Sequence, residues 1–228
     1  TWEVREGIIK HNSEHDRPEA DAEYDMAKSP CLEAQTADVA DEIAYNNHDI
    51  DDGLSSEMID ADSLESVELW RENFNAVKEE YPGADMKIIR YQTVKRIINA
   101  QATDLVETAR KAIEKDGVKS VDDVRNSKPI ARFSPEMDGK NRQLKKFLLV
   151  NLYRHHRVER MAHKAERIIR ELFKTYLKNP RLLPPHLFSH LEKTGKDEHR
   201  VICDYIAGMT DRFALDEFKK LFDPYEKV

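Results

Sequence analysis

Apolar residues recur at steps of three and four along most of the chain, which is the spacing of one buried helix face. The clearest case lies between residues 84 and 115, where the stripe comprises Ile88, Val94, Ile97, Ile98, Leu105, Val106 and Ile113. The same pattern predicts helices over residues 2–11, 31–50, 63–81, 138–153, 156–178 and 185–192, and two last helices on either side of residues 208–211. Asp51-Asp52-Gly53 is expected to end the 31–50 helix, and no segment predicts a strand. These patterns predict an all-α fold.

Composition agrees with a helical protein. The 228 residues include only 7 Gly, where average usage would give roughly 16. No apolar run approaches the ~20 residues that span a bilayer, so we expect a soluble, cytoplasmic protein. Cys31 and Cys203 are too few for a disulfide framework. Because the chain begins at Thr1 within a segment that reads like a domain interior, we also expect that an upstream part is absent.

Charge is unevenly distributed along the chain. Residues 1–62 carry 18 acidic and 4 basic side chains, a balance of −14. Residues 128–181 carry 15 basic and 5 acidic side chains, a balance of +10. The basic segment suits a triphosphate, a nucleic acid or an acidic neighbour, or it forms an ordinary solvated helix face.

The helix predicted over residues 31–50 has two sharply different faces. One face carries the apolar residues Leu32, Val39, Ile43 and Ile50. The opposite face carries Asp38, Asp41, Tyr45, His48 and Asp49, and three of these follow one another at four-residue steps. This polar face is either a solvated acidic surface or a surface that binds a divalent cation and a hydroxylated ligand.

The stretch EAQTADVADEIAYNNHDIDDGL at residues 33–54 resembles a signature of the bacterial deoxyguanosinetriphosphate triphosphohydrolase-like enzymes, which are dNTPases of the HD superfamily. Residues 1–11, residues 157–180 and the stretch DYIAGMTDRFA at residues 204–214 are similar to further parts of that family. The resemblance implies a multi-helix HD-type scaffold that hydrolyses a dNTP to deoxynucleoside and triphosphate with a divalent metal such as Mg²⁺ or Mn²⁺. It also implies a homo-oligomer, a dimer or a hexamer.

The resemblance assigns roles to particular residues. Asp41 would be the last metal ligand of the family's H…HD…D set. Tyr45 would pack on the deoxyribose or hydrogen-bond to it, and Asp49 would accept a hydrogen bond from the sugar 3′-OH. Lys10 is similar in position to a lysine that contacts phosphate oxygens, or it simply caps a helix dipole. His48 is a further candidate for the pocket wall.

The family's first His and its His-Asp pair are expected upstream of Thr1. His15-Asp16 lacks the surroundings of that pair, and His48-Asp49 follows the final Asp in the family's order. We therefore expect residues 1–126 to be the C-terminal part of a catalytic core, residues 127–228 to be a basic helical region, and this chain alone to be inactive. The competing hypothesis is a non-catalytic helical module for oligomerisation or single-strand nucleic-acid binding.

Overall fold

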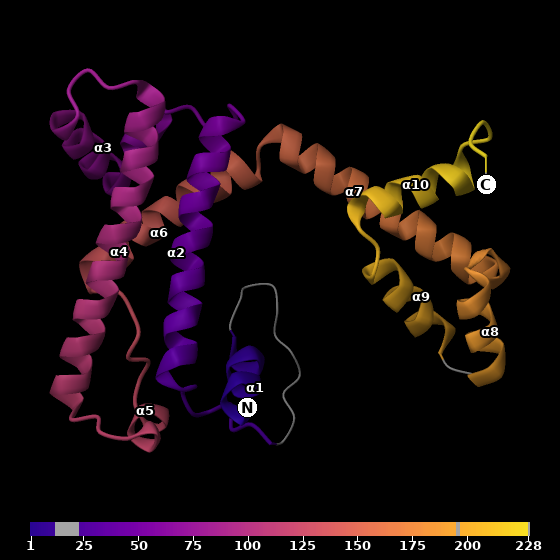
Figure 1. The fold of residues 1–228 in the computed structure, drawn as a ribbon, viewed down its shortest axis with the longest axis horizontal. Coiled ribbons are helices and arrows are strands. Elements are labelled where there is room, and N and C mark those ends of the chain that lie inside the picture. Colours follow the sequence, from indigo (N-terminus) through magenta and orange to yellow (C-terminus); the bar gives the residue numbers. More distant parts are fainter. Residues whose placement is uncertain (12–22, 195–196, 228) are drawn as a thin grey trace. The chain divides into compact units, whose positions relative to one another are not determined.

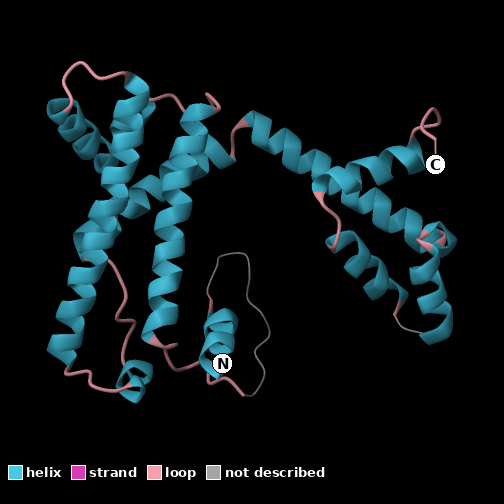
Figure 2. Ribbon diagram, viewed as in Figure 1, coloured by secondary structure: helices cyan, strands magenta, loops and turns pink. Residues whose placement is uncertain are grey.

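The computed structural model describes residues 1–11, 23–194 and 197–227, and within these ranges every regular element is a helix (Figures 1 and 2). The predicted all-α fold is thereby confirmed. The chain forms two compact units, Thr1–His155 and His156–Val228. The division predicted at residue 126 falls inside the first unit, because residues 127–155 pack with the helices that precede them. No helix in the described part of the chain is long and apolar enough to cross a membrane.

The first unit is built on two long helices that lie side by side, α2 (Leu32–Ser55) and α4 (Met86–Asp116), as Figure 1 shows. Its other elements are α1 (Trp2–Lys10), the 3₁₀ turn η1 (Ser63–Ser66), α3 (Glu68–Glu80), α5 (Val121–Asn126), α6 (Pro135–Leu148) and the π-helical segment η2 (Leu149–Tyr153). The core lies where α2, α3, α4 and α6 meet, around Ile50, Leu64, Trp70, Ile97 and Leu148, each at most 1% exposed.

Helix α2 differs from the prediction at its end, because it continues through Asp51-Asp52-Gly53 to Ser55. A Cβ atom on Gly53 would lie 2.4 Å from Cδ1 of Ile59, a buried core residue. The chain folds back at this point, and the amides of Met58 and Ile59 both donate to the carbonyl of Gly53. This glycine therefore permits a close contact between a helix and its return loop and does not break the helix.

Three further elements differ from the sequence-based prediction. The 63–81 segment is divided into η1 and α3, and α6 begins earlier than expected, with Pro135 in its first turn and Ser134 as its cap. The short helix α5 was not predicted from the polar sequence around it. It forms because Ser120 and Asp123 make a reciprocal capping box, which satisfies backbone donors at the helix start.

The second unit contains α7 (His156–Lys178), the 3₁₀ turn η3 (Pro180–Leu182), α8 (Pro185–Thr194), α9 (Glu198–Ala207) and α10 (Asp211–Phe222). Its core consists of Ile168, Leu172, Tyr176, Leu183 and Ile202, so only the C-terminal half of α7 is packed. The turn between α9 and α10 is capped as predicted: Gly208 is the C-cap of α9, and the Thr210 hydroxyl accepts from the amide of Phe213.

Candidate functional site

The two-faced character predicted for α2 is present in the structure. Ile43 and Ile50 are buried against the core, and Asp41, Tyr45 and His48 are exposed on the other side. Asp49 is half-buried, and the Tyr45 side chain is 60% exposed. A large aromatic ring left in solvent beside carboxylates is available to a ligand and adds nothing to the core.

The most specific contact on this face joins α2 to the end of η2. The hydroxyl of Tyr153 donates to Oδ2 of Asp49. The Tyr153 ring also lies against the exposed tyrosine of α2, with 6.5 Å between the ring centroids of Tyr45 and Tyr153. The Asp49 carboxylate thus accepts from one phenol, whose ring contacts a second, exposed tyrosine, and a carboxylate has further lone pairs that can accept other donors.

Tyr153 was not identified as a site residue from the sequence. It lies 104 residues after Asp49, and nothing in the spacing of either residue links the two. The π-helical backbone of residues 149–153 places this side chain, and short π-helical segments often occur at functional sites.

Burial and hydrogen bonding determine the protonation of this pair. Burial raises the pKa of Asp49, and the nearby carboxylate of Asp52 raises it further, while the hydrogen bond from Tyr153 and the neighbouring His48 act in the opposite direction. Burial also raises the pKa of the Tyr153 phenol, and the hydrogen bond to Asp49 adds to that shift. The proton therefore stays on the tyrosine, which is the donor, and Asp49 is the acceptor.

Lys10 lies in a different environment from the one expected of an exposed helix end. Its ammonium is 2.8 Å from Oε1 of Glu6 and 3.0 Å from the carbonyl oxygen of Lys28, and its side chain is only 5% exposed. Glu6 is itself buried and also pairs with Arg125, at 3.4 Å. The structure thus places Lys10 in a buried ionic cluster that ties α1 to α5.

A histidine–carboxylate pair lies near the start of the polar face. Nδ1 of His11 is 2.7 Å from Oδ1 of Asp38, which precedes Asp41 by about one helical turn. His11 was not predicted as a site residue, and Asp38 was predicted only as part of the polar face. The pair brings the end of α1 onto the same face as Tyr45 and Asp49.

The residues present do not fit a complete metal site. Across residues 1–11, 23–194 and 197–227, no three His, Cys, Asp or Glu side chains lie close enough together to hold an ion. Asp41 is an exposed single carboxylate in this part of the chain, and transition-metal and Mg²⁺ sites need several ligands. The pair His15-Asp16 lies outside the described residues.

Comparison with known protein families first identifies the class of domain that part of the chain contains. Residues 131–220 match the model of the phosphohydrolase-associated domain, which runs from the last part of the first unit into α10. The match therefore includes η2 and Tyr153, the partner of Asp49.

Comparison with curated relatives gives the family. The chain is 49% identical over its whole length to a deoxyguanosinetriphosphate triphosphohydrolase-like protein of Geobacter sulfurreducens, and 50% identical to the protein of the same name from Geobacter metallireducens. A relative from Thiobacillus denitrificans is 43% identical over 97% of the chain. The chain spans 59% of the length of each of these three relatives. It belongs to the family of deoxyguanosinetriphosphate triphosphohydrolase-like proteins.

The position of Asp49 leads to a prediction about stability. Because burial raises the pKa of the Asp49 carboxyl above its ordinary value of 3.8, the charged form destabilises the folded state at neutral pH. The substitution Asp49→Asn removes that charge but keeps an acceptor for Tyr153. It should therefore raise the melting temperature at pH 7, and this advantage over the parent chain should shrink as the pH falls through the raised pKa.

The measurement is a thermal melt of both chains across pH 4 to 8, with the exposed Asp51→Asn as the matched control. Asp51→Asn should show no such pH-dependent difference. A stabilisation by Asp49→Asn that is equal at every pH would contradict the prediction.

Proposed function

We propose that this chain is part of a dNTP triphosphohydrolase that hydrolyses dGTP or a similar dNTP to deoxynucleoside and triphosphate with a divalent metal. Support comes from the relatives named deoxyguanosinetriphosphate triphosphohydrolase-like proteins, whose sequences match the chain over nearly all of its length. It also comes from the polar face of α2, where exposed and half-buried groups of the right chemistry occur together.

The observation that carries the proposal is the contact between Tyr153 and Asp49 beside the exposed ring of Tyr45. A carboxylate whose orientation is held by a phenol can accept a further hydrogen bond from a sugar hydroxyl in a defined direction. An aromatic ring next to it offers a flat apolar surface to the deoxyribose, which has one hydroxyl fewer than ribose. We therefore assign Asp49 and Tyr45 to the sugar, with His48 beside them at the edge of the site.

Asp41 and Lys10 are assigned to the other end of the substrate. Asp41 would supply one carboxylate to a metal whose remaining ligands come from outside the described residues. A lysine ammonium has three N–H donors, and Glu6 and the carbonyl of Lys28 accept from Lys10. A third donor thus remains for a phosphate oxygen, and the buried carboxylate of Glu6 holds the lysine side chain in place.

Substitutions on the polar face of α2 test the proposed role of Asp41 as a metal ligand. In an active full-length protein that carries this sequence, Asp41→Ala should abolish triphosphate release from dGTP with Mn²⁺ or Mg²⁺, because it removes a metal ligand. Asp38→Ala is the matched control one turn earlier on the same face, and it should retain measurable turnover. The 228-residue chain alone should release no triphosphate.

Unchanged kinetics in Asp41→Ala would exclude the ligand assignment. Robust triphosphate release by the 228-residue chain would exclude the claim that essential ligands lie outside it. Both reactions can be followed by separating triphosphate from dGTP on an anion-exchange column.

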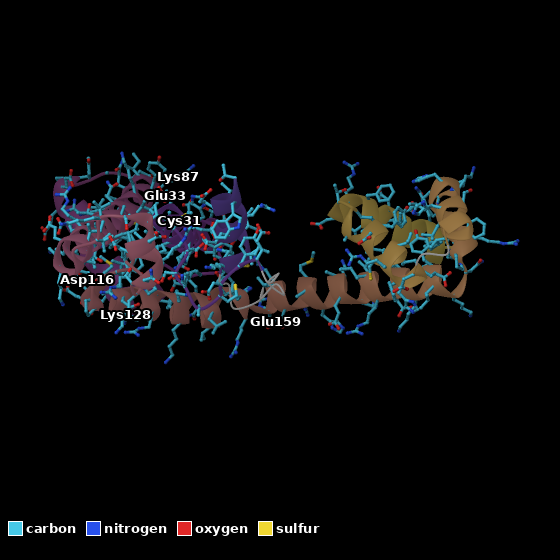
Figure 3. All side chains as sticks on the ribbon, turned by 90° about the horizontal axis from the view of Figure 1, so that it is seen from below. Cys31, Glu33, Lys87, Asp116, Lys128 and Glu159 are labelled. Atoms are coloured by element: carbon cyan, nitrogen blue, oxygen red, sulfur yellow. The ribbon has the colours of Figure 1, made fainter. Side chains whose placement is uncertain are left out.

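A second candidate function, single-strand nucleic-acid binding, is favoured by one observation in the second unit. The first three turns of α7 are almost entirely exposed, and Arg160, Lys164 and Arg167 follow one another there at steps of four and three. Figure 3 shows side chains projecting from this helix in the stretch that includes Glu159. A basic stripe of this kind suits a row of phosphates.

Nucleic-acid binding through this stripe should be strongly salt-dependent, because each neutralised phosphate releases counterions. Replacing Arg160, Lys164 and Arg167 with Glu should abolish binding of a single-stranded oligonucleotide in a filter-binding titration. The same charge change at Lys87, Lys95 and Lys115, which are exposed on α4, is the control and should have little effect. Equal losses in both variants would show that the α7 stripe is not a specific interface.

A further inference from the structure

Four side-chain amides are buried where α2, α4 and α6 meet. Asn46 and Asn47 of α2, Gln101 of α4 and Asn141 of α6 are each at most 4% exposed. We call these four residues the amide cluster. Each one occupies a position in the buried stripe of its helix where an apolar side chain would be usual. Asn141, for example, precedes Leu144 and Leu148 at steps of three and four.

Asn141 is at the centre of the cluster and uses both ends of its amide. Its Oδ1 accepts from Nε2 of Gln101 at 3.1 Å and from Nδ2 of Asn46 at 3.4 Å. Its Nδ2 donates to Oε1 of Glu42 at 2.5 Å. Asn47 completes the cluster by donating to Oε1 of Gln101 at 2.7 Å.

Buried amides are expensive unless they are hydrogen-bonded, so an apolar residue would pack here at lower cost. The amides instead provide hydrogen bonds, which form only in particular orientations of the side chains. The oxygen of Asn141 must face Gln101 and Asn46, and its nitrogen must face Glu42, so α6 fits against α2 and α4 in only one rotation about its axis. An apolar stripe alone would tolerate small rotations and slides.

Helix α6 is attached to α2 a second time through the π-helical segment that follows it. Asn141 contacts Glu42, and Tyr153 contacts Asp49. Along α2 these two acceptors are seven residues apart, or about 10 Å at 1.5 Å per residue. A rotation of α6 at the first attachment would move the tyrosine hydroxyl away from its acceptor at the second.

We infer that Asn141 is a positioning residue, which sets the rotation of α6 so that the Tyr153 hydroxyl meets the Asp49 carboxylate. The amide cluster therefore acts on the polar face of α2 from its buried side. The consequence for nucleoside binding rests on the proposed function, whereas the positioning itself does not.

The sharpest test reverses the direction of one hydrogen bond. In Asn141→Asp a carboxylate oxygen replaces the nitrogen that lies 2.5 Å from Glu42, so two carboxylates face each other and the contact is lost. Adding Glu42→Gln restores a donor on the other side. The new amide can donate to the carboxylate introduced at position 141, while Gln101 and Asn46 continue to donate to the second oxygen of that carboxylate. The double variant should therefore regain the contact between positions 141 and 42. Glu42→Gln alone is the remaining variant of the double-mutant cycle.

The direct readout is the tyrosine ¹³Cζ resonance of Tyr153 in the 228-residue chain, which reports the hydrogen bond of its hydroxyl and is assigned with Tyr153→Phe. Asn141→Asp should move this resonance toward that of an exposed tyrosine, and Asn141→Asp with Glu42→Gln should return it. Asn126→Asp, an exposed site on α5, is the matched control and should leave the resonance unchanged. The second readout is the dissociation constant of deoxyguanosine, which should rise about tenfold in Asn141→Asp and recover in the double variant.

An unchanged Tyr153 resonance in folded Asn141→Asp would overturn the inference. So would a double variant that shows the same resonance as Asn141→Asp, and so would failure of both variants to fold, since the residue would then serve the core in general. If the resonance behaves as expected but deoxyguanosine affinity is the same in every variant, including Tyr153→Phe, the proposed sugar site is wrong and the positioning role stands.

Discussion

Burial of one face of α2 is the constraint on which the rest of the first unit depends. Ile43, Ile50 and Leu54 have to be removed from water, and the helices α4 and α6 cover them. A helix of 24 residues with one face packed in this way must present its other face outward. The row of Asp41, Tyr45 and Asp49 is therefore displayed at fixed spacing by a rigid element, which is what a binding site needs.

The polar groups of this site oppose stability. Asp49 is a partly buried carboxylate whose charged form is disfavoured by burial, and the amide cluster occupies positions where apolar side chains would pack more cheaply. Destabilising groups of this kind occur where they bind a ligand or fix the orientation of a neighbouring helix. In the first unit they lie on both sides of α2, the acceptor on its outer face and the amides on its inner face.

Periodicity was sufficient to predict the helical fold, the two faces of α2 and nearly all the helices, since a buried stripe is a local pattern. It gave the wrong end for α2, because the role of Gly53 depends on Ile59, which packs against it only in the folded chain. Contacts between residues far apart in the sequence determine the environments of Asp49 and Lys10. The partner of Asp49 is 104 residues away, and Lys10 is drawn into the interior by Glu6 and Arg125, so neither environment has a signal in the neighbouring sequence.

The central claim is that Asp49 accepts a hydrogen bond from the sugar of a deoxynucleoside. The most direct measurement compares the dissociation constants of 2′-deoxyguanosine and 2′,3′-dideoxyguanosine for the 228-residue chain by NMR titration, with perturbations followed at Tyr45 and Tyr153. Loss of the 3′-hydroxyl should weaken binding about tenfold, the scale of one hydrogen bond to a charged group, and the perturbed resonances should belong to these two tyrosines. Equal affinity for the two nucleosides, or perturbations confined to other parts of the chain, would contradict it.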